Sequence, residues 1–351
     1  MRLLIAGDKT RFIHLKQLIA ELGKIGIESK LIYDLEFIDK FFEMNIKKKI
    51  DRNKNFRKIL NEFNPDAVLL DRISKIGKKV IEQNIPLLIL LSGNLWEESS
   101  WAKKTIYKSR IKKLALAKNE RLIDFCLKKS SIILPISKYL ENEVKKRYPE
   151  KNVELFPADG RVPKEWYSIT GQKLKHPCVG LLQGLNIWGK SKEILTLKNV
   201  LKKLPQVTFY LAGDGIYRDQ IIPELKNFEN FVWLGSLEYP VEVKKFLSEI
   251  DIYLLLSGME GLGQTIIEAL LMEKPVIATN IGGIPELIED GKTGFLIETG
   301  NHEDLIKKIN HVFDQPVIAN NMGAKGKKII KENFNWDKIA KKFVLILNQN
   351  I

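Results

Sequence analysis

Residues 251–279, DIYLLLSGMEGLGQTIIEALLMEKPVIAT, join two strand-like runs through a helix and so decide the fold. The apolar run DIYLLL ends in the glycine-rich turn SGMEGLG, the segment QTIIEALLME follows as a helix, and PVIAT is a second apolar run. A strand, a helix and another strand in this order predict a βαβ unit, from which parallel sheets are built. The turn therefore lies at the carboxyl edge of such a sheet, where these sheets bind ligands.

The same alternation of strand-like runs and amphipathic helices extends along the chain and predicts an α/β fold. It occurs in two series, because the pattern restarts at PCVGLLQG. The runs of the second series are apolar at successive positions, which is typical of strands buried on both faces. The predicted runs are RLLIAG, SKLIYDL, DAVLLDR, PLLILLSG and SIILPIS, then PCVGLLQG, TFYLAGDG, NFVWLGS, DIYLLLSG, KPVIATN and TGFLIE.

The length of 351 residues suggests about two domains. Residues 156–177, rich in proline, glycine and charge, separate the two series and are predicted to be the linker. We expect two facing Rossmann-like domains, an N-terminal one over 1–165 and a C-terminal one over 172–332. The last segment, 333–351, is predicted to be a single amphipathic helix.

The composition, with 44% hydrophobic and 28% charged residues, is that of a soluble globular protein. No apolar run approaches the roughly 20 residues that span a bilayer, and the start MRLLIAGDKTRFIHL fits a first strand rather than a signal peptide. Cys126 and Cys178 are far apart, so the sequence shows neither a disulfide framework nor metal-ligand spacing. A cytoplasmic location is therefore expected.

Positive charge is concentrated in the first half of the chain. The net charge is +14; residues 1–170 hold 35 Lys and Arg against 22 Asp and Glu, whereas residues 171–351 hold 22 against 21. The stretches 45–58 and 101–129 interleave these lysines and arginines with apolar residues, as helices on anionic membrane surfaces do. A solvated helix face is the alternative. No nucleic-acid-binding module is visible, so nucleic acid is not an expected partner.

Two glutamates, Glu260 and Glu268, bracket the turn after DIYLLL. Main-chain amides at the start of the following helix are unsatisfied, and the glycines of the turn allow a bulky anion such as a diphosphate to approach them. A carboxylate suits hydrogen bonding to sugar hydroxyls, including the vicinal diol of a ribose, because it only accepts hydrogen bonds. Chance spacing in an ordinary glycine-rich turn is the alternative.

The stretch EGLGQTIIEALLMEKPVIATNIGGIPELIEDGKTGFLI resembles the signature of retaining glycosyltransferases of the GT-B fold, family 4. The resemblance extends to VGLLQGLNIWGKSKEIL, to LAGDG and to NWDKIAKKFVLIL, the family's closing helix, which crosses back to the first domain. Earlier in the chain, only SSIILPISKYLENEVKKRYPEKNVELFPADG shares more than pattern. The matching positions of the signature are Glu260, Gly261, Gly263, Glu268, Ala269, Pro275, Gly282, Gly283, Glu286 and Gly294.

The resemblance implies that Glu268 holds the ribose of a nucleotide sugar, that Glu260 contacts the transferred sugar and that Lys190 contacts the diphosphate. Glu260 and Lys190 are the candidate catalytic residues. No metal and no cofactor are expected, and the implied donor is a UDP- or GDP-sugar. The other candidate donor-binding residues are Gly184, Gly261, Leu262, Gly263, Gln264 and Thr265.

The chain also departs from the family pattern. The family usually has an arginine after the glycine of this loop, and here Gly184 is followed by Leu185. A histidine that many members carry in the first domain is replaced in LLSGNLW by Gly93 and Asn94. His14, on a predicted helix, is expected to be structural or to face an acceptor.

The sequence therefore predicts a glycosyltransferase that retains anomeric configuration and moves a hexose from a nucleotide diphosphate to a glycan or lipid-linked acceptor. The predicted location is the inner face of the cell membrane, bound peripherally. Two alternatives stay open. One is an inactive homologue that serves as a binding or scaffold subunit, and the other is an epimerase or phosphorylase with the same fold.

Overall fold

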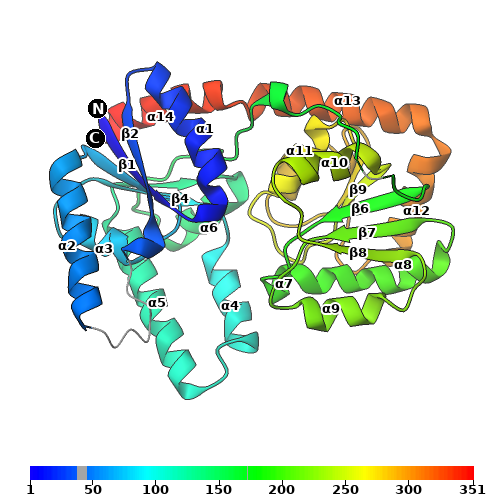
Figure 1. The fold of residues 1–351 in the computed structure, drawn as a ribbon, viewed down its shortest axis with the longest axis horizontal. Helices are drawn as coiled ribbons and strands as arrows, with labels where there is room; N and C mark the ends of the chain where they lie inside the picture. The colour runs from blue at the N-terminus through cyan, green and yellow to red at the C-terminus, as the bar shows by residue number, and fades with distance from the viewer. Residues whose placement is uncertain (38–45, 172) are drawn as a thin grey trace. The chain divides into compact units, whose positions relative to one another are not determined.

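The computed structural model describes residues 1–37, 46–171 and 173–351, and these form two compact units. Unit 1 comprises Met1–Asn94, Ile106–Arg161 and Phe334–Ile351, and unit 2 comprises Leu95–Thr105 and Val162–Asn333. Each contains one parallel sheet covered by helices (Figure 1). Within the described ranges, no helix has the length and apolar content needed to cross a bilayer.

Unit 1 is built on a five-stranded parallel sheet in the order β2-β1-β3-β4-β5. Its central strands are buried apolar runs, as expected for a sheet covered on both faces. The strands are β1 (Arg2–Gly7), β2 (Glu28–Tyr33), β3 (Ala67–Leu70), β4 (Leu87–Leu91) and β5 (Ile132–Pro135). The helices are α1 (Phe12–Lys24), α2 (Ile46–Phe63), α3 (Lys75–Ile81), α5 (Arg110–Lys129), α6 (Lys138–Arg147) and α14 (Trp336–Asn350).

The last helix, α14, belongs to unit 1 although it follows all of unit 2 in the sequence (Figure 1). Trp336 at its start is buried, and its Nε1 donates a hydrogen bond of 2.9 Å to Gln17 Oε1 on α1. Further along, the ring of Phe343 stacks on Phe156 at a centroid distance of 4.7 Å. The predicted return of the terminal helix to the first domain is confirmed.

The predicted linker, 156–177, is only partly a linker. Phe156 and Arg161 are buried in unit 1, where the Arg161 guanidinium donates to the main-chain oxygens of Asp159 and Gly160 at 3.0 Å. A Cβ at Gly160 would lie 2.5 Å from the Trp336 ring, so this glycine allows α14 to pack closely. The proline and glycine content thus reflects close packing as well as a domain boundary.

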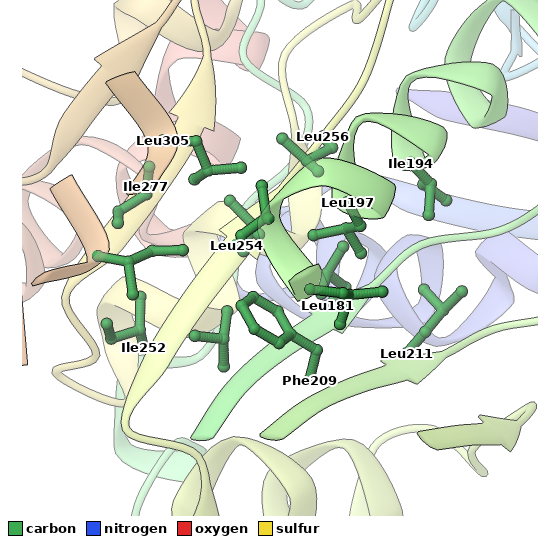
Figure 2. Close-up of a cluster of buried hydrophobic side chains, with 14 of the residues drawn as sticks. Leu181, Ile194, Leu197, Phe209, Leu211, Ile252, Leu254, Leu256, Ile277 and Leu305 are labelled. Atoms are coloured by element: carbon green, nitrogen blue, oxygen red, sulfur yellow. The ribbon is translucent and has the colours of Figure 1, made fainter. Parts of the chain in front are cut away.

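Unit 2 is built on a six-stranded parallel sheet in the order β11-β10-β9-β6-β7-β8. Side chains such as Phe209, Leu254 and Ile277 form its hydrophobic core (Figure 2). The strands are β6 (Cys178–Leu182), β7 (Thr208–Ala212), β8 (Phe231–Gly235), β9 (Ile252–Leu255), β10 (Val276–Thr279) and β11 (Phe295–Ile297). The helices are α4 (Leu95–Thr105), α7 (Trp188–Ser191), α8 (Leu197–Lys203), α9 (Arg218–Leu225), α10 (Val241–Glu249), α11 (Gln264–Leu271), α12 (His302–Asp314) and α13 (Pro316–Asn333).

Every predicted strand-like run overlaps one of these strands, so the predicted α/β fold is confirmed. Short 3-10 helices lie at several turns: η1 (Lys9–Arg11), η2 (Asp34–Glu36), η3 (Pro163–Glu165), η4 (Lys192–Thr196) and η5 (Ile284–Glu286).

The predicted domain limits placed helix α4 in the N-terminal domain. It groups with unit 2. A Cβ at Gly189 would lie 2.5 Å from the ring of Trp101, and the Tyr217 hydroxyl donates a hydrogen bond of 2.7 Å to Thr105 Oγ1. The carboxyl-terminal half of α4 therefore contacts other elements of unit 2, which local sequence pattern cannot reveal.

Candidate functional site

The strand order of unit 2 reverses at β6, whose neighbours are β7 on one side and β9 on the other. In open α/β sheets ligands bind beside such a reversal, beyond the carboxyl ends of the strands. The loop after β6 carries Gly184 and leads to Lys190, and the loop after β9 carries Glu260. The predicted site residues thus come from the two loops that flank the reversal.

The structure brings Lys190 and Glu260 together. Lys190 Nζ lies 3.0 Å from Glu260 Oε2, and the two side chains are 24% and 13% exposed. The other carboxylate oxygen of Glu260 lies 3.3 Å from the hydroxyl of Ser257. Ser257 is in turn held to β10, because Thr279 Oγ1 accepts a hydrogen bond from its amide and donates one to its carbonyl. This partly buried ion pair is therefore fixed to the end of the sheet.

The glycine pair after β10 sets the position of Glu260. Gly282 has a φ of +59°, and a Cβ there would lie 1.9 Å from the Glu260 carbonyl oxygen. A Cβ at Gly283 would lie 2.2 Å from the Gly261 carbonyl oxygen. The Gly283 amide donates a hydrogen bond of 3.2 Å to the Glu260 carbonyl. Only glycines allow these two loops to pack so closely.

Helix α11 begins directly after Gly263, whose φ of +96° lies in the left-handed region. Its first residues, Gln264 and Thr265, are half-buried, whereas Gly261 and Leu262 are buried. Thr265 Oγ1 accepts a hydrogen bond of 2.5 Å from the Tyr253 hydroxyl of β9. The amino end of this helix, with its partial positive charge, therefore lies on the same loop as Glu260.

Glu268 lies on α11 and is only 3% exposed. Burial raises the pKa of the Tyr253 hydroxyl, and the negative charges of Glu268 and Glu260 raise it further. Tyr253 is therefore neutral at physiological pH. The predicted ribose contact would have to be made through the small accessible part of the Glu268 side chain.

The structure of the loop after β6 shows why Leu185 differs from the arginine of the family pattern. This side chain is fully buried in the hydrophobic core of unit 2, while Gly184 before it is exposed. Gln183 is 6% exposed, and its Nε2 donates a hydrogen bond of 3.4 Å to the Lys190 carbonyl. Lys192 lies over the Trp101 ring, 4.3 Å from its centroid. Leucine at 185 thus supports the core, and Gln183 is the neighbouring polar group that contacts Lys190.

Glu98 on α4 is a candidate site residue that the sequence analysis missed. Burial raises the pKa of its half-buried carboxyl; the positive charge of Lys190 lowers this pKa and the negative charge of Glu260 raises it. These electrostatic interactions indicate that Glu98 lies within range of the charges of the ion pair. The sequence signal was WEES, two carboxylates in the first turn of the helix after β4. Without knowledge that α4 contacts unit 2, this signal could not be interpreted.

At the carboxyl edge of the first sheet, two arginines lie among carboxylates. Arg11 contacts Asp71 at 3.3 Å and Asp159 at 2.7 Å. Arg72 contacts Asp34 at 2.9 Å, and its Nη1 lies 3.1 Å from Asp8. These pairs neutralise much of the charge at this edge.

The position of the missing histidine is occupied by Asn94, which is buried and donates a hydrogen bond of 2.7 Å to the Tyr139 hydroxyl. His14 is also buried in unit 1. Burial lowers the pKa of its imidazole to about 2, and the charges of Arg161 and Arg11 contribute to this shift. His14 is therefore neutral at any physiological pH and belongs to the structural core of the unit.

The predicted basic stretches line a groove between α2, α3 and α5 of unit 1, with a volume of about 1390 Å³. Apolar side chains beside the lysines are exposed, among them Ile50, Ile111 and Leu114 on α2 and α5. Trp101, in contrast, packs on Gly189. Asn45 of the stretch 45–58, and the aromatic segment 41–45 before it, lie outside the described residues.

Comparison with known proteins gives a family match in the second half of the chain. Residues 189–329 match the family described as Glycosyl transferases group 1. This region is therefore similar to group 1 glycosyltransferases. A trehalose synthase of Thermococcus litoralis is 30% identical over 210 residues, which are 57% of this chain and 50% of that protein. The chain thus spans about half the length of the curated relatives that it matches.

Two solved structures show that the similarity in fold extends beyond the group 1 domain. Sucrose-phosphate synthase from Thermosynechococcus elongatus superposes with a TM-score of 0.79 and 15% identity over 99% of this chain and 98% of that chain. HepE from Anabaena, in complex with UDP-glucose, superposes with a TM-score of 0.76 and 16% identity over 99% and 100%. The predicted GT-B fold is confirmed, and at these identities the likeness concerns the fold.

Proposed function

We propose that this protein is a retaining glycosyltransferase of family 4 that transfers a hexose from a nucleotide diphosphate donor. The observation that carries the proposal is the Lys190–Glu260 pair beside the amino end of α11, where the strand order of the sheet reverses. The group 1 match covers this pair, and a structure of similar fold is in complex with UDP-glucose.

The chemistry needs groups that stabilise a departing nucleoside diphosphate. Negative charge grows on the phosphate oxygen as its bond to the sugar C1 breaks, and a fixed ammonium and helix amides stabilise that charge. The Lys190 ammonium has three N–H donors, so it can bind a phosphate oxygen and still contact Glu260. The acceptor hydroxyl forms the new bond to C1 on the face that the diphosphate leaves, and its proton passes to the departing phosphate oxygen.

Within this proposal, Glu260 orients the sugar through its hydroxyls and Glu268 binds the ribose of the donor. The main-chain amides from Gly261 to Thr265 bind the sugar and the diphosphate. Gly184 and its loop form the opposite wall, since Gly184 is exposed and a Cβ there would meet only Asn186 Nδ2, at 4.0 Å. The donor is a UDP- or GDP-sugar.

We propose that unit 1 binds a glycan or lipid-linked acceptor at an anionic membrane surface. The groove between α2, α3 and α5 is lined by eight lysines and arginines and two glutamates. Exposed Ile111 and Leu114 on α5 add apolar contact beside this charge. Basic residues beside exposed apolar ones favour binding at the boundary between headgroups and acyl chains. We therefore propose a peripheral location at the inner face of the cell membrane.

The test is release of nucleoside diphosphate from a panel of UDP-, GDP- and ADP-sugars, with and without membrane extracts as acceptor. We expect one donor to yield diphosphate faster with acceptor, and NMR of the glycoside to show the anomeric configuration of the donor. Donor binding without turnover under all conditions would favour the scaffold alternative. Interconversion of sugars without an acceptor would favour the epimerase, and phosphate-dependent cleavage of a glycan would favour the phosphorylase.

A further inference from the structure

Three side chains with metal-binding atoms meet at the amino edge of the second sheet, the edge opposite to Glu260. Cys178 is the first residue of β6, His176 lies two residues before it, and Asp251 lies directly before β9. Strands β6 and β9 are hydrogen-bonded neighbours, with Val179 paired to Ile252. The topology therefore places the three side chains together, although Asp251 is more than 70 residues away in the sequence.

The three donor atoms are close enough to share one metal ion, and the 2.8 Å hydrogen-bond distance between His176 Nδ1 and Asp251 Oδ2 must lengthen when the ion binds. His176 Nδ1 lies 3.6 Å from Cys178 Sγ and 2.8 Å from Asp251 Oδ2, and the three ligand atoms all lie within 4.8 Å of one another. In a tetrahedral zinc site, Zn–S and Zn–N bonds of about 2.3 and 2.0 Å place sulfur and nitrogen about 3.6 Å apart. The observed sulfur–nitrogen distance fits this edge of the tetrahedron.

We propose that His176 Nδ1, Cys178 Sγ and an Asp251 carboxylate oxygen bind one zinc ion, with water as the fourth ligand. Thiolate, imidazole and carboxylate are the ligands that zinc takes in proteins. The His176 side chain is 46% exposed and opens the group to solvent, while Cys178 is buried. Zinc at this place would join the segment before β6 to the start of β9.

The charges around the group favour a divalent cation. Asp251 is held in place by the Cys178 amide, which donates a hydrogen bond of 2.8 Å to its Oδ2. Lys274 supplies positive charge near Asp251 and Cys178, and Glu249 supplies negative charge near Lys274. Burial raises the pKa of the Cys178 thiol to about 12, so the metal-free surroundings hold two carboxylates against one ammonium, and the thiolate forms only when zinc displaces its proton. Zinc binding displaces the thiol proton of Cys178. Where His176 Nδ1 carries the proton that it donates to Asp251, zinc binding displaces that proton as well.

An ordinary ion pair between His176 and Asp251 is the competing interpretation. The two are separated by titrating the metal-free full-length protein with Co²⁺, which gives a thiolate-to-metal charge-transfer absorption only when sulfur is a ligand. We expect this absorption at one Co²⁺ per chain, and its displacement by Zn²⁺. Cys178→Ser should abolish it. The matched control Cys126→Ser removes the other buried cysteine, which lies in unit 1, and should keep it.

A second variant keeps the test valid if Cys178→Ser fails to fold. His176→Ala changes an exposed side chain, and we expect it to weaken Zn²⁺ affinity at least tenfold, as the loss of even an outer-shell partner costs about 10- to 100-fold. Absence of the charge-transfer absorption in the wild type would overturn the proposal. So would its persistence in Cys178→Ser, its loss in Cys126→Ser, or unchanged Zn²⁺ affinity in His176→Ala.

Discussion

Charged side chains have different surroundings at the carboxyl edges of the two sheets. In unit 1, Arg11 lies between the buried carboxylates Asp71 and Asp159, and it is itself only 13% exposed. In unit 2, Lys190 contacts Glu260 beside loops that glycines bring close together and beside the amino end of a helix. The first arrangement joins chain segments, whereas the second places a cation beside main-chain donors, as binding of an anion requires. Variants at each edge should therefore affect different properties.

The largest expected effect is on the stability of unit 1. Arg11→Met removes the guanidinium that contacts both Asp71 and Asp159. Because loss of one partner leaves buried charge uncompensated, we expect the free energy of unfolding to fall by about 3–5 kcal/mol in urea titrations. Lys24→Met, which breaks an exposed pair with Glu21, is the control and should cost less than about 1 kcal/mol.

The stability lost in Arg11→Met should also depend on pH. Burial already raises the pKa of Asp71, and the charge of Arg11 opposes that shift, so Arg11→Met should raise this pKa further. A carboxyl whose pKa is raised on folding binds more protons in the folded state, and stability then falls as pH rises through that pKa. The loss of stability should accordingly be larger at pH 8 than at pH 5. A loss independent of pH would contradict the assignment.

The next largest effect is expected on turnover, at the carboxyl edge of the sheet of unit 2. Lys190→Ala removes the ammonium proposed to stabilise the leaving diphosphate, and we expect kcat to fall by about 100- to 1000-fold, as for loss of one oxyanion donor. Lys192→Ala is the matched control, because Lys192 lies over the Trp101 ring. Equal losses of kcat in the two variants would show that Lys190 has no special role.

Donor binding should depend on Glu268. Glu268→Ala removes the acceptor of two charge-assisted hydrogen bonds to ribose, and calorimetry should show donor affinity weaker by about 3 kcal/mol. Glu289→Ala, at an exposed glutamate on the same unit, should leave affinity unchanged. If Glu268→Ala folds and binds the donor as tightly as the wild type, the ribose role is wrong.

A smaller effect is expected at Glu98. Because burial raises the pKa of this carboxyl, lowering the pH neutralises it and removes a negative charge beside the proposed diphosphate site. Wild-type donor affinity should therefore rise as pH falls through this raised pKa. Glu98→Gln should bind the donor several-fold more tightly at neutral pH and lose this rise, whereas Glu97→Gln should keep it. Identical pH profiles for Glu98→Gln and wild type would exclude Glu98 from the site.

A further effect of modest size is expected at the membrane surface. Leu114→Ser removes a side chain that is 72% exposed on α5. Sedimentation with vesicles of anionic phospholipid should show binding weaker by about 1–2 kcal/mol, while soluble-donor affinity stays the same. Val317→Ser, at an equally exposed side chain in unit 2, is the control. Equal binding to neutral and anionic vesicles would contradict the role of the basic groove.

The strands could be predicted well from the sequence because buried parallel strands consist of short runs of apolar residues, as in RLLIAG and DIYLLL. The sequence also predicted which loops carry Lys190 and Glu260, since a local motif determines where a strand ends and its helix begins. Contacts between distant segments were not accessible. Nothing near WEES indicates that Glu98 lies beside Lys190, and nothing near Cys178 indicates Asp251. The burial of Leu185 likewise depends on how the following helices pack.

The position of α14 also determines how the protein can be divided. A fragment of residues 1–161 would contain every strand of the first sheet, yet it would lack the partners of Gln17 and Phe156. During synthesis, the amino-terminal half therefore has an uncovered apolar surface until α14 has left the ribosome. Attempts to express that half alone should yield aggregates, and supplying the terminal helix as a separate peptide should rescue its solubility.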